Sequence, residues 1–112
     1  MGDAYDVVVI GAGSTGENVA DRAVRGGLTA VMVEAELIGG DCSYWACMPS
    51  KVLLRGPEAL AAARAIPGAA GAVTGGVDAA ATLRRRDAFA AHWSDTGQVE
   101  WARSRGIDVV RG

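Results

Sequence analysis

The chain contains few histidine and cysteine residues, which are the usual ligands of structural zinc sites. It has one histidine, His92, and two cysteines, Cys42 and Cys47, among 112 residues. A structural zinc site needs about four such ligands, so we expect no metal centre, and His92 is interpreted as a residue of a helix surface. The chain also lacks a large excess of positive or negative charge, because its net charge is −2. This balance argues against a general nucleic-acid-binding protein, and the one basic run, Arg84-Arg85-Arg86, is interpreted as a solvated helix face.

Long apolar runs are absent as well. No segment approaches the ~20 apolar residues that a membrane helix needs, so we expect no membrane partner. The N-terminal residues 1–6 are acidic and lead directly into a predicted strand, unlike a targeting segment. Asp6 stands where a myristoylation signal requires Ser or Thr. We therefore expect a cytoplasmic protein, in which two close cysteines are more often catalytic or metal-binding than structural.

Apolar residues make up half of the chain, enough for the core of one small domain. The β-branched run Val7–Ile10 predicts a parallel strand buried on both faces. A helix is expected over Glu17–Arg25, and a second buried strand over Thr29–Val33, which ends at Glu34. Together they predict a right-handed βαβ unit and an α/β fold.

The rest of the chain is expected to be mostly helical. Pro49 fits the first turn of a helix, and Gly56-Pro57 is expected to interrupt it. Asp78 is a candidate N-cap for a helix that runs to about Trp93. The other expected elements are helices over 50–55, 58–65 and 98–105, a buried side of the 78–93 helix made by Leu83, Phe89, Ala90 and Trp93, and a strand over 107–110.

The last predicted strand ends two residues before the end of the chain. Such a strand lies at a sheet edge or needs further strands beside it. We therefore expect residues 1–112 to be the N-terminal piece of a longer protein, and the chain alone to be marginally stable.

A glycine-rich loop follows the first strand. Gly11, Gly13 and Gly16 form a G-x-G-x-x-G pattern between a strand and a helix. The first glycine permits a tight turn, the second lets a pyrophosphate approach the backbone, and the third lets the helix pack on the strand. Glu34, about twenty residues further on, can accept hydrogen bonds from a ribose. The alternative is an ordinary turn with a surface glutamate, and the pattern does not distinguish FAD from NAD.

Both cysteines lie in the segment Gly39–Lys51. Five positions along a regular helix separate two Cα atoms by about 8.7 Å, whereas a disulfide requires less than about 7 Å. If Cys42 and Cys47 are bonded, the segment is not a regular helix throughout, and Cys42 lies in an entry loop or a distorted first turn. A helix N-terminus near Cys47 would favour its thiolate. Two structural cysteines, or a soft metal ion on both thiolates, are alternatives.

The segment Gly39–Lys51 resembles the G-G-T-C-x-N-x-G-C-x-P-S-K signature of the flavoprotein disulfide reductases. This family includes dihydrolipoamide dehydrogenase, glutathione reductase and mercuric reductase. The resemblance implies that Cys42 is the thiol that attacks a substrate disulfide, that Cys47 lies beside the flavin, and that Lys51 stabilises the reduced flavin.

The same resemblance implies a Rossmann-like FAD/NAD(P)-binding domain, of which this chain is the N-terminal part. It implies FAD as cofactor, NAD(P)H as co-substrate bound by a separate domain, a small disulfide or dithiol as substrate, and a homodimer. The residues implied to bind FAD are Gly11, Gly13, Ser14, Gly16, Glu34, Gly40, Asp41, Ser50 and Lys51.

Between the cysteines the chain departs from the family pattern. Tyr44, Trp45 and Ala46 replace the usual Asn-x-Gly. The redox pair itself is intact, so the change leaves the substrate open, and Trp45 is interpreted as a packing residue. We therefore expect an oxidoreductase that moves electrons between NAD(P)H and a Cys42–Cys47 disulfide, in either direction. A flavin monooxygenase or oxidase with passive cysteines, and a nucleotide-binding module without turnover, are the alternatives.

Overall fold

A computed structural model describes residues 2–112 of the chain. In chain order the elements are β1 (Val7–Ile10), α1 (Ser14–Arg25), β2 (Ala30–Glu34), α2 (Gly40–Tyr44), α3 (Cys47–Ala65), the 3-10 turn η1 (Ala70–Ala72), α4 (Ala79–Phe89), the 3-10 turn η2 (Ala91–Trp93), α5 (Thr96–Ser104) and β3 (Ile107–Arg111).

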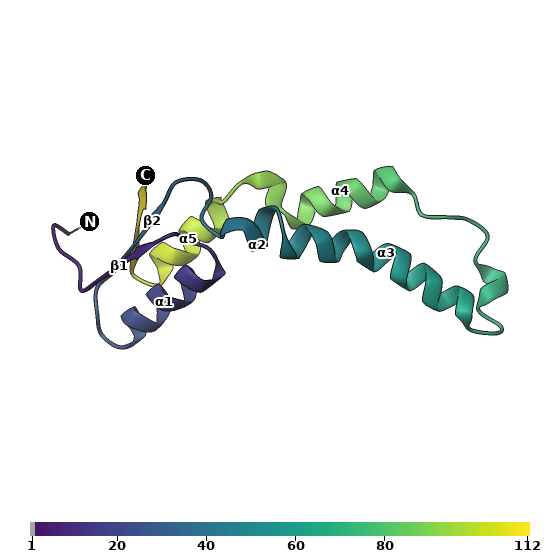
Figure 1. The fold of residues 1–112 in the computed structure, drawn as a ribbon, viewed down its shortest axis with the longest axis horizontal. Coiled ribbons are helices and arrows are strands. Elements are labelled where there is room, and N and C mark those ends of the chain that lie inside the picture. Colours follow the sequence, from purple (N-terminus) through teal and green to yellow (C-terminus); the bar gives the residue numbers. More distant parts are fainter. Residues whose placement is uncertain (1) are drawn as a thin grey trace.

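The strands form one parallel sheet in the order β1-β2-β3. Val7 is opposite Ala30, and Ala30 is opposite Ile107 in turn. This confirms the predicted α/β fold and matches the N-terminal part of a Rossmann-like domain. Because the strands are parallel, the carboxyl ends of β1 and β2 lie at one edge of the sheet (Figure 1).

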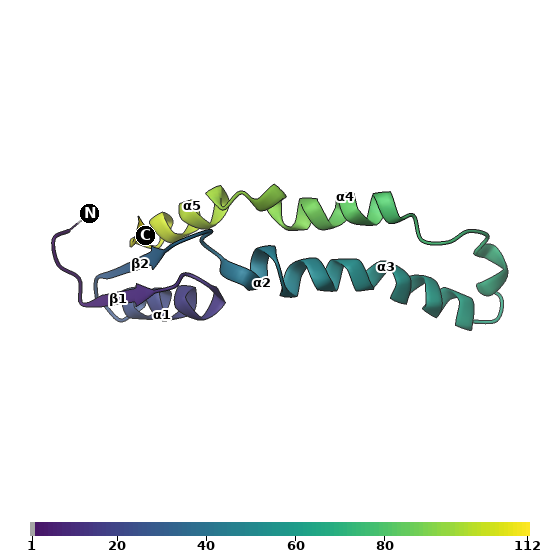
Figure 2. The ribbon, with the colours of Figure 1, turned by 45° about the horizontal axis from the view of Figure 1, so that its top comes forward.

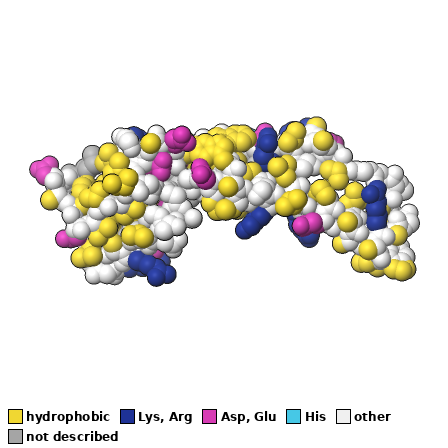
Figure 3. All heavy atoms as spheres, viewed as in Figure 1, with side chains coloured by type: hydrophobic (Ala, Val, Ile, Leu, Met, Phe, Trp, Pro, Cys, Tyr) yellow, Lys and Arg dark blue, Asp and Glu magenta, His cyan; other side chains and the backbone are white. Residues whose placement is uncertain are grey.

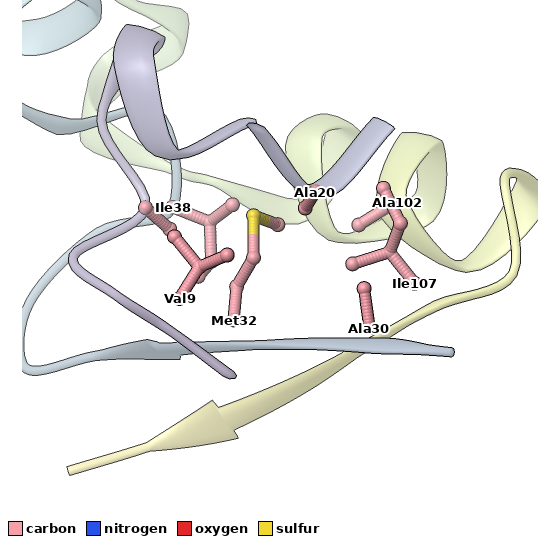
Figure 4. Packing of buried hydrophobic residues seen from close by; sticks show 8 residues of the cluster. Val9, Ala20, Ala30, Met32, Ile38, Ala102 and Ile107 are labelled. Carbon is pink, nitrogen blue, oxygen red and sulfur yellow. The ribbon is translucent and has the colours of Figure 1, made fainter. Parts of the chain in front are cut away.

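The core lies between the sheet and helices α1 and α5. Met32 of β2 points from the sheet toward Ala20 of α1 and Ala102 of α5 (Figure 4). All three are fully buried. Alanine at both helix positions lets the helix backbones approach the sheet, and Ile38 and Ile107 fill the remaining space.

The expectation that β1 is buried on both faces is wrong. Val9 faces the core, but Val8 and Ile10 on the opposite face are 57% and 88% exposed. Helices α1 and α5 contribute to one and the same core cluster and so cover one face of the sheet. Within the described residues β1 is also an edge strand, which leaves its outer face open to solvent.

Helices α3 and α4 form an arm that extends away from the sheet (Figures 1 and 2). The described chain measures 64 × 25 × 19 Å as a result. Hydrophobic side chains are visible along the arm as well as on the body of the molecule (Figure 3), and Leu54, Ile66 and Leu83 are among the exposed ones. In residues 2–112 no helix has both the length and the apolar character needed to span a membrane.

Gly56-Pro57 does not interrupt the helix that follows the cysteines, contrary to expectation. Helix α3 continues to Ala65 with Pro57 inside it. Proline removes one backbone donor, but both residues are exposed on the arm, where water can bond to the carbonyl group that loses its partner.

The predicted helix over 78–93 is also shorter than expected. Asp78 is its N-cap, as predicted, and its Oδ1 accepts a hydrogen bond of 2.9 Å from Ala81 N. The helix ends at Phe89, because Ala91, His92 and Trp93 adopt φ angles of 50°, 51° and 57°. The expected buried side is wrong except at Ala90, because the side chains of Leu83, Phe89 and Trp93 are exposed.

Candidate functional site

The glycine loop connects β1 to α1 in the predicted way. Gly11 has φ +94°, a backbone conformation that favours glycine. Gly13 is the N-cap of α1 and provides no side-chain cap, so the first N–H groups of the helix are available to an anion. A Cβ at Gly16 would overlap the carbonyl oxygen of Gly11, which explains why only glycine fits the third position.

A second glycine pair packs against this loop. Gly39 N donates a hydrogen bond of 2.8 Å to Ala12 O, and Gly39 also forms a parallel bridge with Gly13. A Cβ on Gly40 would lie 2.7 Å from the Cα of Gly13. Gly40, which the resemblance predicts to contact the cofactor, thus also packs against the glycine loop, and this packing places the cysteine segment directly beside that loop.

Glu34 lies at the end of β2, next to the same loop. Its Oε2 accepts a hydrogen bond of 2.7 Å from Ala12 N, and its Oε1 accepts one of 3.0 Å from Glu36 N. The carboxylate is therefore held by two backbone donors at the carboxyl edge of the sheet. Its expected bond to a ribose stays a prediction.

A cavity of about 660 Å³ joins these features. It falls in the range typical of small-molecule and cofactor sites. Nine of the predicted site residues line it: Gly11, Gly13, Ser14, Gly16, Glu34, Gly40, Asp41, Cys42 and Cys47. Ser50 and Lys51 lie outside this lining, on α3, where both are exposed. Ser50 Oγ donates to Cys47 O at 3.2 Å.

Cys42 and Cys47 form a disulfide, with their Cα atoms 4.5 Å apart. Cys42 lies in the short helix α2, whereas Cys47 is the first residue of α3. Trp45 and Ala46 break the helix between them, and their N–H groups both donate to Asp41 O, at 2.8 and 2.6 Å. The prediction that residues 42–47 do not form one regular helix when Cys42 and Cys47 are bonded is confirmed. In the part of the chain that the structure describes, no group of three or more His, Cys, Asp or Glu side chains could hold a metal ion.

Two aromatic residues separate the cysteines and differ in their surroundings. Tyr44 is buried, and its hydroxyl donates a hydrogen bond of 2.9 Å to Ile38 O. Burial, together with the nearby charge of Asp95, raises the pKa of Tyr44. Trp45 packs edge-to-face on Tyr44, with ring centroids 5.9 Å apart, but it is also 48% exposed and lines the cavity.

Two further residues support the cysteine segment and were not recognised as such from the sequence. The Trp93 indole N–H donates to Tyr44 O at 3.1 Å, and Asp95 Oδ2 accepts a hydrogen bond of 2.7 Å from Ile38 N. Asp95 also forms an ion pair of 2.6 Å with Arg111. Neither residue belongs to a motif, so local sequence carried no signal for these contacts.

The cavity has the features that a dinucleotide requires. It combines an uncapped helix N-terminus for phosphates and a carboxylate for a ribose. A side chain at Gly16 or Gly40 would collide with the backbone of the glycine loop. The disulfide opens onto the same space. The residues present thus fit FAD, with the dithiol at one part of the cavity and the glycine loop at another.

Comparison with known proteins gives a consistent result. A family model described as pyridine nucleotide-disulphide oxidoreductase matches residues 5–103. Dihydrolipoyl dehydrogenase 3 of Pseudomonas aeruginosa is 52% identical over 64 residues, which cover 56% of this chain and 14% of that protein. The mercuric reductase of Staphylococcus aureus is 29% identical over 109 residues, which cover 96% of this chain and 20% of that protein.

A solved structure has the same fold. The Cu(II) complex of the HOCl-induced flavoprotein disulfide reductase RclA from Escherichia coli matches 99% of this chain with a TM-score of 0.73 and 20% sequence identity. The match covers 22% of that protein's chain. The present chain therefore spans about a fifth or less of the length of these relatives.

Proposed function

Because the chain belongs to the pyridine nucleotide-disulphide oxidoreductase family, we propose that it is the FAD-binding and dithiol-carrying part of an enzyme that exchanges electrons between NAD(P)H and the Cys42–Cys47 disulfide. The observation that carries this proposal is the shared cavity: the disulfide and the glycine loop line the same space. A small-molecule disulfide or dithiol is the proposed substrate.

The proposal extends to the architecture of the whole enzyme. Residues 1–112 form the N-terminal portion of the FAD domain, while the NAD(P)-binding and dimerisation domains lie outside this chain. The full-length protein is a cytoplasmic homodimer in this proposal. The short coverage of the relatives supports the first part, since this chain matches only 12–14% of the dihydrolipoyl dehydrogenases.

The cofactor-binding residues have distinct roles. The backbone N–H groups at the start of α1, after Gly13, bind the pyrophosphate, and Glu34 binds the ribose of the ADP half. Ser14, Gly40, Asp41 and Ser50 provide further contacts. When bound, FAD supplies hydride acceptance from NAD(P)H and electron transfer to the disulfide.

The dithiol performs the exchange with the substrate. The Cys42 thiolate attacks one sulfur of the substrate disulfide, which forms a mixed disulfide and releases the first substrate thiolate. The Cys47 thiolate then attacks Cys42 Sγ, which restores the protein disulfide and releases the second thiolate. Cys47 is the first residue of the 19-residue helix α3, whose N-terminus favours its thiolate. Lys51, one turn further along the exposed side of α3, stabilises the reduced cofactor.

The test is a visible absorption spectrum of the protein supplied with FAD, before and after one equivalent of dithiothreitol. We expect a flavin spectrum that gains a long-wavelength band on reduction, produced by the Cys47 thiolate beside the flavin. Cys42→Ser should show this band without reductant, whereas Cys47→Ser should lack it under all conditions. A flavin spectrum that reduction and both variants leave unchanged would contradict the dithiol role and favour passive cysteines.

A further inference from the structure

The left-handed turn η2 (Ala91–Trp93) follows α4 and contacts the redox segment, residues 38–51, which contains both cysteines. Three successive residues, Ala91, His92 and Trp93, have positive φ angles between 50° and 57°. Residues other than glycine seldom adopt this conformation, and a run of three is unfavourable unless surrounding contacts hold it. The contacts of Trp93, the last residue of the turn, therefore indicate the role of this left-handed conformation.

The turn directs the Trp93 side chain at the loop between the two cysteines. Its indole N–H donates to Tyr44 O at 3.1 Å. Tyr44 ends α2, so its carbonyl group is one of those that have no partner within the helix. The Arg86 guanidinium lies over the Trp93 ring, 5.5 Å from its centre, and this contact also restrains the ring.

A second contact from the same part of the chain holds the segment before Cys42. Asp95 Oδ2 accepts from Ile38 N, and Tyr44 Oη donates to Ile38 O. Trp93 and Asp95 thus bind the redox segment on both sides of Cys42, although they are about fifty residues away in sequence. Ala90, immediately before the turn, is buried and anchors it.

We propose that Trp93 is a positioning residue that keeps Cys42 and Cys47 close after their disulfide is reduced, and so sets the reduction potential of the pair. In the oxidised protein the covalent bond holds the segment whether or not Trp93 is present. After reduction only non-covalent contacts restrain it, and the bond from Trp93 to Tyr44 O is the hydrogen bond that the connection between α4 and α5 makes to the residues between the two cysteines. Loss of that bond increases the conformational freedom of the dithiol form alone, which favours reduction.

This inference rests on the proposed function, because it requires the pair to cycle between disulfide and dithiol. The equilibrium to be measured is protein disulfide plus dithiothreitol giving protein dithiol plus cyclic oxidised dithiothreitol. Two electrons and two protons pass from the reagent to the protein, and the new disulfide forms within the reagent. The ratio of dithiol to disulfide protein is read by thiol alkylation and mass spectrometry over a series of redox buffers.

For Trp93→Phe we expect an equilibrium shifted about three- to tenfold toward the dithiol, which corresponds to ~14–30 mV. The matched control is Trp101→Phe, which changes a tryptophan that packs against the core from α5; its equilibrium should stay within twofold of that of the unchanged protein. A Trp93→Phe value equal to the control value would overturn the proposal. A purely structural role would lower the thermal stability of oxidised Trp93→Phe without moving this equilibrium.

A second replacement keeps the test decisive if Trp93→Phe does not fold. 3-Benzothienylalanine at position 93 preserves the ring shape and the contact with Arg86, but has sulfur in place of the N–H group. It should shift the equilibrium in the same direction, and an unchanged equilibrium would overturn the proposal. A disulfide that no dithiothreitol concentration reduces in the folded protein would instead contradict the proposed function itself.

Discussion

The carboxylate of Glu34 accepts a hydrogen bond of 2.7 Å from the backbone N–H of Ala12. This contact joins the end of β2 to the glycine loop after β1, so the two parts of the predicted nucleotide site are held together by a bond within the protein. The other carboxylate oxygen accepts from Glu36 N, which stabilises the chain as it leaves the sheet.

Glu34→Ala should therefore lower the free energy of unfolding, because two backbone donors lose a charged acceptor. We expect a loss of about 1–2 kcal/mol in urea unfolding, since the site is only partly buried. Glu34→Gln keeps one acceptor oxygen and should lose less. Glu36→Ala, at an exposed position, is the control and should have little effect; an equal loss in the control would contradict a specific role for the bond to Ala12.

Alanine substitutions at Gly16 and Gly13 should distinguish an effect on folding stability from an effect on nucleotide binding. A Cβ at Gly16 would overlap the Gly11 carbonyl oxygen, whereas a Cβ at Gly13 meets nothing within 4 Å. Gly16→Ala should thus cost about 2–3 kcal/mol of folding stability. Gly13→Ala should fold within about 0.5 kcal/mol of the unchanged protein but weaken binding of ADP, measured by titration calorimetry, because the methyl group projects where the pyrophosphate would lie. Equal stability losses would show that the two positions are equivalent.

The parts of the fold that sequence predicted are those governed by local rules. The β-branched runs predicted the ends of β1 and β2 to within one residue. The glycine loop and the Asp78 cap follow from backbone conformation and short-range hydrogen bonds. The break between the cysteines followed from helix geometry only under the premise that Cys42 and Cys47 are bonded, because five helical steps are too long for a disulfide.

The features that sequence missed depend on contacts between distant residues. Ala91-His92-Trp93 contains no glycine or proline, so nothing local indicates a left-handed turn there; the bond from Trp93 to Tyr44 O supports it from 49 residues away. The exposure of Val8 and Ile10 likewise depends on which elements cover the sheet, and an apolar strand sequence does not carry that information.

Stability should vary with pH through Glu17. Burial raises the pKa of its carboxyl group above the ordinary value of 4.5, and its Oε1 has no hydrogen-bond partner in the described residues. The folded protein then binds this proton more tightly than the unfolded chain, so stability is greater below pH 4.5 and decreases as the pH rises through the raised pKa.

Glu17→Gln removes that charge and should abolish this contribution. Measured by urea unfolding at a series of pH values, the variant should gain stability over the unchanged protein above the raised pKa, and the gain should vanish toward pH 4 and below. The control is Glu100→Gln, an exposed residue of α5, which should follow the unchanged protein. A gain that is independent of pH would exclude ionisation of Glu17 as the cause.

Glycine at position 92 should stabilise the left-handed turn η2. His92 is exposed and has φ +51°, a conformation that costs about 1–2 kcal/mol for a residue with a Cβ. Glycine avoids this cost, although its greater freedom in the unfolded chain returns part of the gain. We therefore expect His92→Gly to raise the free energy of unfolding by about 0.5 kcal/mol. Ala88→Gly, in the regular part of α4, should instead lower it by about 1 kcal/mol. Opposite signs from two glycine substitutions four residues apart would confirm the positive φ at position 92, and two losses of equal size would show that the turn is right-handed in solution.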